Sequence, residues 1–231
     1  MQTVSPRVRL IAHTVSTAQS EDILESQPDS TDAEYLTTLA GRACYQSFHR
    51  PNEATRLDED YLKRTLFEQG HWSIAEHASA TFYLEGVSRA FTHELIRHRH
   101  LSYSQLSQRF VDESDAAYVV PPAMRGNVIV ENALASSIAD ALISYDCAVG
   151  MLLHDGYSRK QAREAARAFL PNCIETKIVV SDNLRAWNEV TLRRMQPDAD
   201  AEMQEVMGLI YDELTEIAPA IFPFRSDDDD Y

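Results

Sequence analysis

Residues 78–99 read ASATFYLEGVSRAFTHELIRHR, and this stretch contains signals for both a strand and a helix. Its first part, Ala78–Leu84, is rich in residues that favour β-strands. Ser88 is a good N-cap, and we expect the helix that it starts to run through Arg99. Three potentially cationic side chains recur every four residues on one face of that helix: Arg89, His93 and Arg97. The stretch therefore predicts a strand followed directly by a helix with a cationic face.

Apolar spacing and capping residues predict the other elements, working outward from this stretch. Strands are expected at Val8–Ala12 and Ile174–Ser181, and a polar loop at Thr17–Asp32. Helices are expected at Ala33–Tyr45, Asp58–Gln69, Asn127–His154, Ser158–Leu170, Asp182–Arg194 and Ala199–Ala218. We expect Asp58 and the pair Ser158 and Gln161 to act as caps, and the helix at 127–154 to be largely buried.

The chain has no internal repeat and no linker long enough to separate domains. Residues 1–225 are therefore predicted to form a single α+β domain. This domain is helix-rich and surrounds a central, largely antiparallel or mixed β-sheet. Residues 226–231 contain four consecutive aspartates and are predicted to be a solvated acidic tail.

The charge and the cysteines of the chain limit its partners and its compartment. With a formal net charge of -15, the 231-residue chain repels polyanions, so we expect no nucleic-acid binding as its main function. Its three cysteines form no CxxC pair, which favours reducing conditions. The N-terminus lacks the apolar core of a signal peptide, and the apolar stretch at 133–153 is interrupted by Asp140 and Asp146. We therefore expect a cytoplasmic protein without a membrane span.

Basic, hydroxyl and amide side chains are concentrated in residues 97–110, RHRHLSYSQLSQRF. In the whole chain, acidic residues outnumber lysine and arginine 36 to 21, so this cluster stands out. Arginine forks with hydroxyl and amide donors suit phosphate oxygens, because charge-assisted bidentate hydrogen bonds are strong. The segment therefore predicts a phosphate pocket. The alternative is a surface helix end whose arginines pair with carboxylates such as Glu85 and Glu94.

The same segment resembles the signature of the flavin-dependent thymidylate synthases, particularly their actinobacterial members. RHR is followed by seven residues and then by Ser107, with Ser102 and Arg109 also in register. Further ordered matches are GRAC at 41–44, GHWSIAEH at 70–77, ARAFLPN at 166–172 and NLRAW at 183–187. The resemblance covers roughly Gly41 to Met203, and it implies the thymidylate synthase-complementing protein fold.

This resemblance also implies which residues form the site. The FAD site would comprise His71, Ser73, Glu76, Arg97, His98, Arg99, Gln105, Asn183, Leu184, Arg185 and Glu189, with His71 near both flavin and folate. The dUMP site would comprise Arg89, Glu94, Leu95, Ile96, Arg97, Gln105, Leu106, Ser107, Gln108, Arg109, Arg167 and Arg194. Arg194 would be catalytic, because it matches the family's uracil-facing arginine and a fixed cation stabilises a pyrimidine deprotonated at N3.

The implied reaction is the reductive methylation of dUMP to dTMP. The one-carbon donor would be 5,10-methylenetetrahydrofolate, and NADPH would reduce the FAD. The resemblance further implies a homotetramer with active sites shared between subunits. Two rivals stay open, namely a flavoprotein that methylates uracil in RNA and a non-enzymatic nucleotide-binding protein. Three residues depart from those common in the family: Phe110, Glu189 and Asp198. Two of these changes remove a donor near the flavin, and each lost hydrogen bond is worth about 1 kcal/mol.

Histidine and cysteine residues predict no further chemistry. Five histidines lie within residues 71–100, but they lack HExxH or another tight ligand spacing, so no metal site is expected. Cys173 has no neighbouring histidine or helix N-terminus to lower its thiol pKa, so we interpret it as packing. Ser107 as a phosphate contact needs no activating base and is not expected to be a nucleophile. Both interpretations fit a flavin-dependent route without a cysteine adduct.

Overall fold

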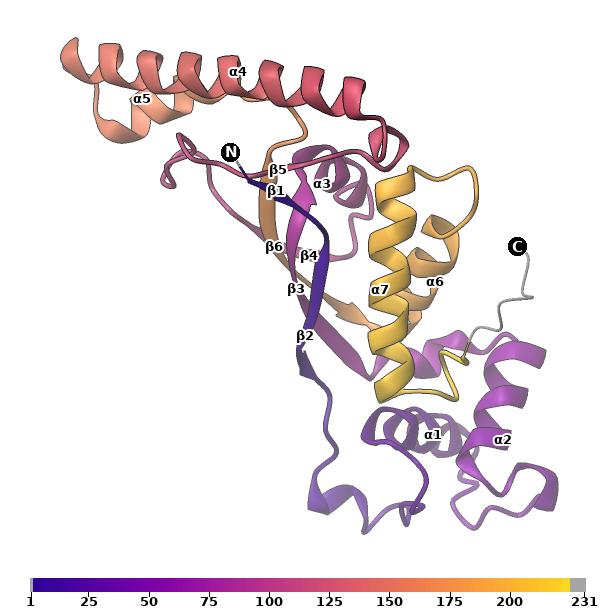
Figure 1. The fold of residues 1–231 in the computed structure, drawn as a ribbon. Helices are drawn as coiled ribbons and strands as arrows, with labels where there is room; N and C mark the ends of the chain where they lie inside the picture. The colour runs from indigo at the N-terminus through magenta and orange to yellow at the C-terminus, as the bar shows by residue number, and fades with distance from the viewer. Residues whose placement is uncertain (1, 225–231) are drawn as a thin grey trace.

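Four antiparallel strands form the sheet that organises the chain. The computed structural model describes residues 2–224, so the predicted acidic tail at 226–231 lies outside the described residues. The strands, in spatial order, are β2 (Arg7–His13), β3 (Ser79–Ser88), β6 (Glu175–Asn183) and β4 (Ser102–Gln105). Each neighbouring pair is antiparallel, and helices lie along one side of the sheet and at both of its ends (Figure 1). The predicted helix-rich α+β fold around a central antiparallel sheet is confirmed.

Alternating apolar residues on β3 and β6 build the larger core. Phe82 and Leu84 are fully buried and pair in register with Val180 and Ile178. Every second side chain of a strand points to the same face, so this alternation directs one face of the sheet toward the helices. Several helices join this core, among them α6 (Leu184–Arg194) and α7 (Ala201–Ile217). Apolar residues on one side of α7 are buried or partly buried: Val206, Met207, Ile210, Leu214 and Ile217.

A bulge in β3 requires glycine at position 86. The register of β3 against β6 shifts between Leu84 and Val87. Gly86 has a φ of +67°, and a Cβ there would lie 2.0 Å from the backbone oxygen of Ser5. Both the left-handed backbone and this close approach exclude a side chain. The glycine thus allows the segment before β2 to cross β3 closely.

One end of the molecule contains a small second sheet and two paired helices (Figure 1). The strands β1 (Thr3–Val4) and β5 (Tyr118–Val119) pair in parallel. The helices and turns at this end are η5 (Pro122–Met124), α4 (Val128–His154), α5 (Arg159–Ala166) and η6 (Arg167–Phe169). The predicted capping box of Ser158 and Gln161 is present at the start of α5. However, α5 ends at Ala166 rather than at Leu170, because the chain tightens into the 3-10 turn η6.

Helix α4 is far more exposed than predicted. Of its 27 residues, only Ile138, Leu142 and Tyr145 are buried. Other large apolar side chains are between 64% and 82% exposed: Val128, Ile129, Ile143 and Met151. The apolar composition alone predicted burial, but only one stripe of the helix packs against the rest of this chain. By length and composition α4 is also apolar enough to cross a membrane, which is weak evidence for a span.

The opposite end of the molecule contains α1 and α2 (Figure 1). Helix α1 (Asp32–Tyr45) begins with a capping box at Thr31, and the predicted loop before it contains the turn η1 (Ala18–Ser20). The next elements are η2 (Glu53–Thr55), α2 (Asp58–Leu62) and a π-helix, η3 (Lys63–Glu68). The prediction that Asp58 caps this helix is wrong, because Leu57 occupies the N-cap position. The carboxylate of Asp58 instead accepts a hydrogen bond from Arg50 at 2.5 Å.

The helix after β3 ends earlier than predicted. Helix α3 (Arg89–Leu95) starts at the predicted cap, but it stops four residues before Arg99. The Tyr103 hydroxyl lies 2.8 Å from the carbonyl oxygens of both Leu95 and His98, so it stabilises the turn that ends the helix. Arg97 consequently lies beyond α3, off the helix face on which it was predicted. Residues 102–105 then pair with β6 as strand β4, which the sequence did not predict.

Candidate active site

A cavity of about 670 Å³ lies where the end of α3 meets the end of α6. Its lining combines arginines, a histidine and a glutamate: Glu94, Ile96, Arg97, His98, Arg99, Arg193 and Arg194. The early end of α3 produces this cluster, because residues 96–99 form a turn instead of another turn of helix. All of these residues except Arg193 belong to the predicted site. Arg193 was not predicted as a site residue, because no motif or spacing in its helix distinguishes it from the neighbouring Arg194.

Arg194 is held by two neighbours in this cavity. Its Nε donates a hydrogen bond to Nε2 of His98 at 2.8 Å, and its Nη1 lies 3.5 Å from Oε2 of Glu94. Burial, together with the charge of Arg194, lowers the pKa of His98 to about 4. The imidazole is therefore neutral at physiological pH, with Nε2 as the acceptor and the proton on Nδ1. This hydrogen bond orients the guanidinium of the predicted catalytic arginine.

Two arginines of the signature segment, Arg97 and Arg99, lack acidic partners. Among the described residues, neither Arg97 nor Arg99 forms an ion pair, although both are exposed. The alternative to a phosphate pocket was that they pair with carboxylates such as Glu85 and Glu94. Glu85 instead pairs with two residues of β2, Arg7 and Arg9, and Glu94 pairs with Arg194. The alternative is therefore wrong for these two arginines, which leaves a cationic cavity in an acidic protein.

A second cavity, of about 320 Å³, contains three other predicted substrate residues: Arg89, Gln108 and Arg167. Gln108 is only 6% exposed, and its Nε2 has no hydrogen-bond partner. Nη1 of Arg89 is likewise buried without a partner. Buried donors without acceptors are costly, so two of them on residues that line one cavity favour an anionic oxygen-rich ligand. The polar part of the lining also contains His93, Asn172 and the carboxylate of Glu164.

The remaining predicted substrate residues have varied surroundings. Leu95 is fully buried in the core, so a ligand can reach only its backbone. The amide of Gln105 donates to the hydroxyls of Thr92 and Thr176 at 2.9 and 3.2 Å. Two backbone contacts fix the next residues: Leu106 N donates to Lys177 O, and Ser107 O accepts from Phe110 N. Nη1 of Arg109 lies 3.7 Å from the carboxylate of Glu164, which lines the second cavity.

The predicted flavin residues outside the signature gather between η4 (Trp72–Glu76) and the start of α6. The exposed side chains of Glu76 and Arg185 form an ion pair across these two elements. Asn183 is the N-cap of α6, and its side chain accepts from Ala186 N at 2.9 Å. Of the other members, Leu184 is buried, whereas Ser73 and Glu189 are exposed.

His71 lies in a third cavity. This cavity, of about 310 Å³, is lined by two tyrosines, an arginine and polar residues: Tyr45, Ser47, Thr55, Tyr61, Arg64, Thr65, Gln69 and His71. No lining residue is shared between this cavity and the two cavities above. The structure therefore distributes the predicted site over separate surfaces of one chain.

The residues that depart from those common in the family lie at the surface, and the cysteine considered as a nucleophile is disfavoured. Phe110 is 62% exposed, and the cations of Arg109 and Lys160 lie 5.7 and 5.6 Å from its ring centroid. Asp198 is exposed.

Burial raises the pKa of the Cys173 thiol, which makes this cysteine a poor nucleophile. Within residues 2–224, no group of three or more His, Cys, Asp or Glu side chains could hold a metal ion.

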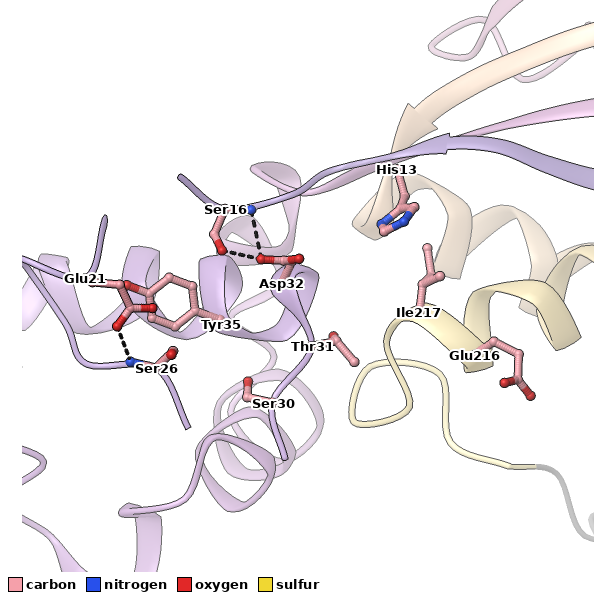
Figure 2. Close-up of a pocket in the computed structure, with 10 residues that line it drawn as sticks. All are labelled: His13, Ser16, Glu21, Ser26, Ser30, Thr31, Asp32, Tyr35, Glu216 and Ile217. Atoms are coloured by element: carbon pink, nitrogen blue, oxygen red, sulfur yellow. Dashed lines mark hydrogen bonds between the residues drawn. The ribbon is translucent and has the colours of Figure 1, made fainter. Parts of the chain in front are cut away.

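One polar cavity contains none of the predicted residues. Figure 2 shows this cavity, of about 420 Å³, between the end of β2, the loop before α1 and the end of α7. Asp32 accepts hydrogen bonds from the backbone and hydroxyl of Ser16, and Glu21 accepts from the backbone of Ser26 at 3.0 Å. Both carboxylates therefore stabilise the loop before α1, and this structural role explains why they lie in the cavity.

Comparison with known proteins identifies the family of this chain. The family model described as thymidylate synthase complementing protein matches residues 28–220. The flavin-dependent thymidylate synthase of Mycobacteroides abscessus is 44% identical over 223 residues, covering 94% of this chain and 88% of that protein. The Mycobacterium tuberculosis enzyme of the same name is 42% identical over 231 residues, covering 96% and 90%.

The fold also matches a solved structure. Thymidylate synthase X from Helicobacter pylori, crystallised with FAD and dUMP, superposes with a TM-score of 0.68 at 19% identity. The match covers 94% of this chain and 97% of the other, so it supports the fold. Together, the family model and the mycobacterial relatives establish that this chain belongs to the flavin-dependent thymidylate synthase family.

Proposed function

We propose that this protein is an FAD-dependent enzyme that converts dUMP to dTMP. The observation that carries the proposal is the cavity in which His98 orients Arg194 beside two arginines without acidic partners. Family membership over residues 28–220 supports flavin dependence and thymidylate synthesis. The Helicobacter pylori relative, which was crystallised with FAD and dUMP, supports the choice of these two ligands.

The residues present fit a flavin dinucleotide. Arg97 and Arg99 supply exposed guanidinium groups that suit the oxygens of a diphosphate, together with the neighbouring His98. Asn183 and Arg185 would contact the cofactor from the start of α6, and Ser73 and Glu76 from η4, with further contacts from His71, Gln105, Leu184 and Glu189. When bound, FAD supplies the redox chemistry, whereas the protein positions the reactants.

Arg194 acts on the pyrimidine in this proposal. A guanidinium held by His98 and Glu94 is fixed before the substrate binds. It therefore stabilises negative charge that develops on the uracil ring at little reorganisation cost. The neutral state of His98 matters here, because a protonated imidazole could not accept the hydrogen bond from Nε.

The phosphate of dUMP would occupy the second cavity. Its buried donors on Arg89 and Gln108 lack partners, and Arg167 adds a further positive charge. The phosphate oxygens would satisfy both donors. Glu94, Leu95, Ile96, Arg97 and residues 105–109 would complete the nucleotide site, as predicted from the signature.

We further propose 5,10-methylenetetrahydrofolate as the one-carbon donor and NADPH as the reductant of FAD. The raised thiol pKa of Cys173 supports a route without a cysteine adduct. The free thiols of Cys44 and Cys147, both exposed, support a reducing cytoplasmic location. The high negative net charge supports small-molecule substrates rather than nucleic acid.

A homotetramer would bring the separate surfaces together. The predicted site residues line separate cavities of one chain, and a second copy would complete each site. Helix α4 offers the most conspicuous unpartnered face, where Ile129 is 82% and Ile143 is 68% exposed. Apolar surface of this extent is expected to be covered in the assembly.

Ile143→Asp is expected to reduce the size of the assembly, because an unpaired carboxylate would be buried in an apolar interface. Size-exclusion chromatography with light scattering measures this directly. Val15→Asp is the matched control, since Val15 is 63% exposed in a loop. A wild-type monomer, or a tetramer that persists in Ile143→Asp, would contradict the assembly proposed through α4.

The visible spectrum of the purified protein tests the main proposal. We expect a yellow protein that oxidises NADPH faster when dUMP is present and forms dTMP from 5,10-methylenetetrahydrofolate. A colourless protein that binds no added FAD would refute the proposal and favour the non-enzymatic nucleotide-binding alternative. Methylation of uracil in RNA, without methylation of dUMP, would favour the other alternative.

A further inference from the structure

Arg194 is held by a short segment, residues 94–98, at the point where α3 ends. Its Nε donates to Nε2 of His98 at 2.8 Å, and its Nη2 lies 3.5 Å from the carbonyl oxygen of Glu94. Its Nη1 lies 3.5 Å from the carboxylate of the same glutamate. The position of this segment therefore sets the position of the guanidinium.

Helical structure fixes only the first part of this segment. Helix α3 ends at Leu95, and His98 lies in the turn beyond it. Two local hydrogen bonds shape the turn, because His98 N donates to Leu95 O at 3.1 Å and Leu101 N donates to His98 O at 3.1 Å. These bonds link residues three positions apart, so they shape the turn without connecting it to the sheet.

Tyr103 connects this turn to the sheet. Its hydroxyl lies 2.8 Å from the carbonyl oxygens of both Leu95 and His98, so the two oxygens share its one proton. Burial raises the pKa of the Tyr103 hydroxyl, which therefore remains a donor at neutral pH. Tyr103 lies in β4, where it pairs with Val180 of β6, and its ring packs against the larger core. The turn is thus held by a residue that the sheet itself fixes.

We propose that Tyr103 is a positioning residue for thymidylate formation. Its hydroxyl holds the turn in which His98 lies, and His98 in turn orients Arg194. This inference rests on the proposed function, because Arg194 acts there on the pyrimidine of dUMP. Tyr103 is absent from the lining of the first and second cavities, so its effect on the reaction passes through His98 and Arg194.

A small displacement of His98 is enough to affect the reaction. The hydrogen bond from Arg194 to His98 is 2.8 Å long, and such bonds weaken steeply when they are poorly aligned. A fixed positive charge stabilises the transition state only where negative charge develops, so a misplaced guanidinium lowers the rate. Binding of dUMP is affected less, because the proposed phosphate contacts Arg89 and Arg167 lie in the second cavity.

Tyr103→Phe tests the inference. The substitution keeps the ring in the core, and both carbonyl oxygens retain their backbone donors, so we expect a folded protein. With saturating FAD, single-turnover formation of dTMP is expected to slow about tenfold, while the Kd for dUMP changes by less than about twofold. Circular dichroism of the variant checks that the fold is kept.

Tyr35→Phe is the matched control. The Tyr35 hydroxyl likewise donates to a backbone carbonyl, that of Leu24 at 2.6 Å, but Tyr35 lines neither of the two cavities. This variant also loses a hydrogen bond from a tyrosine to the backbone, and it is expected to form dTMP at the wild-type rate.

A double-mutant cycle shows whether Tyr103 acts through Arg194. In an Arg194→Ala background the guanidinium is absent, so the addition of Tyr103→Phe is expected to slow dTMP formation by less than about twofold. A merely structural role of the hydroxyl would lower the rate by the same factor in both backgrounds. That result would overturn the inference and assign the effect to the other residues of the turn, such as Arg97 and Arg99.

The outcomes separate this inference from the proposed function. A Tyr103→Phe enzyme that forms dTMP at the wild-type rate would overturn the inference and leave the proposed function in place. An equal loss of rate in Tyr35→Phe would overturn it as well, because the loss would then reflect stability alone. A wild-type protein that forms no dTMP would instead refute the proposed function, and the inference with it.

Discussion

Arg194→Ala is expected to lower the rate of dTMP formation by about 10²- to 10³-fold, while the purified protein stays yellow. The guanidinium is fixed by His98 at 2.8 Å and by Glu94 at 3.5 Å, so its loss removes a preorganised positive charge. The neighbouring arginines that would hold the flavin remain. The measurement pairs single-turnover formation of dTMP with the flavin content of the same preparation.

Arg99→Ala is the matched comparison, because it removes an arginine from the same cavity. This variant is expected to lose FAD on purification and to recover activity when FAD is added in excess. The reverse pattern would show that the assigned roles are wrong. In particular, an Arg194→Ala protein that loses its colour but turns over normally with added FAD would place Arg194 on the cofactor.

Trp187→Ala is expected to lower the free energy of unfolding by about 3–5 kcal/mol. The indole is fully buried, its Nε1 donates to Ala80 O at 3.0 Å, and its ring meets Phe82 edge-on at 5.1 Å. The substitution would leave both a cavity and an unsatisfied carbonyl between α6 and β3. Urea denaturation followed by circular dichroism at a fixed protein concentration measures the change, since assembly also contributes to stability.

Trp187→Phe separates the two effects. It keeps an aromatic ring but removes the indole donor, so we expect a loss of about 1–3 kcal/mol from the unsatisfied Ala80 carbonyl. Trp72→Ala is a control at the chain's other tryptophan, which is only half-buried. A loss below 1 kcal/mol in Trp187→Ala would contradict the role of Trp187 in holding α6 on the sheet.

Local hydrogen bonds explain which elements were predictable. Ser88, Ser158 and Asn127 each accept from a backbone N–H three residues later, as a cap should. Such contacts depend on residues within one helical turn, so the sequence reveals them directly. The alternating strands were recognisable for the same reason, because their period of two is local. The site residues were predicted from the resemblance to the family, and their roles remain predictions.

Contacts between distant residues explain what could not be predicted. The end of α3 depends on the Tyr103 hydroxyl, and strand β4 depends on its pairing with β6 more than seventy positions later. The exposure of α4 depends on how much of its apolar surface this chain covers by itself. No local pattern reports any of these, because each arises from packing between segments that are far apart in the chain.

The sequence by itself determined the three longest strands, most helix starts, the excess of negative charge and the basic segment at 97–110. The tertiary structure alone decided that Arg194 meets His98 across 96 positions and that the site residues line separate cavities. The physical reason is that composition sets which charges a chain carries, whereas burial and proximity set how strongly those charges act on one another.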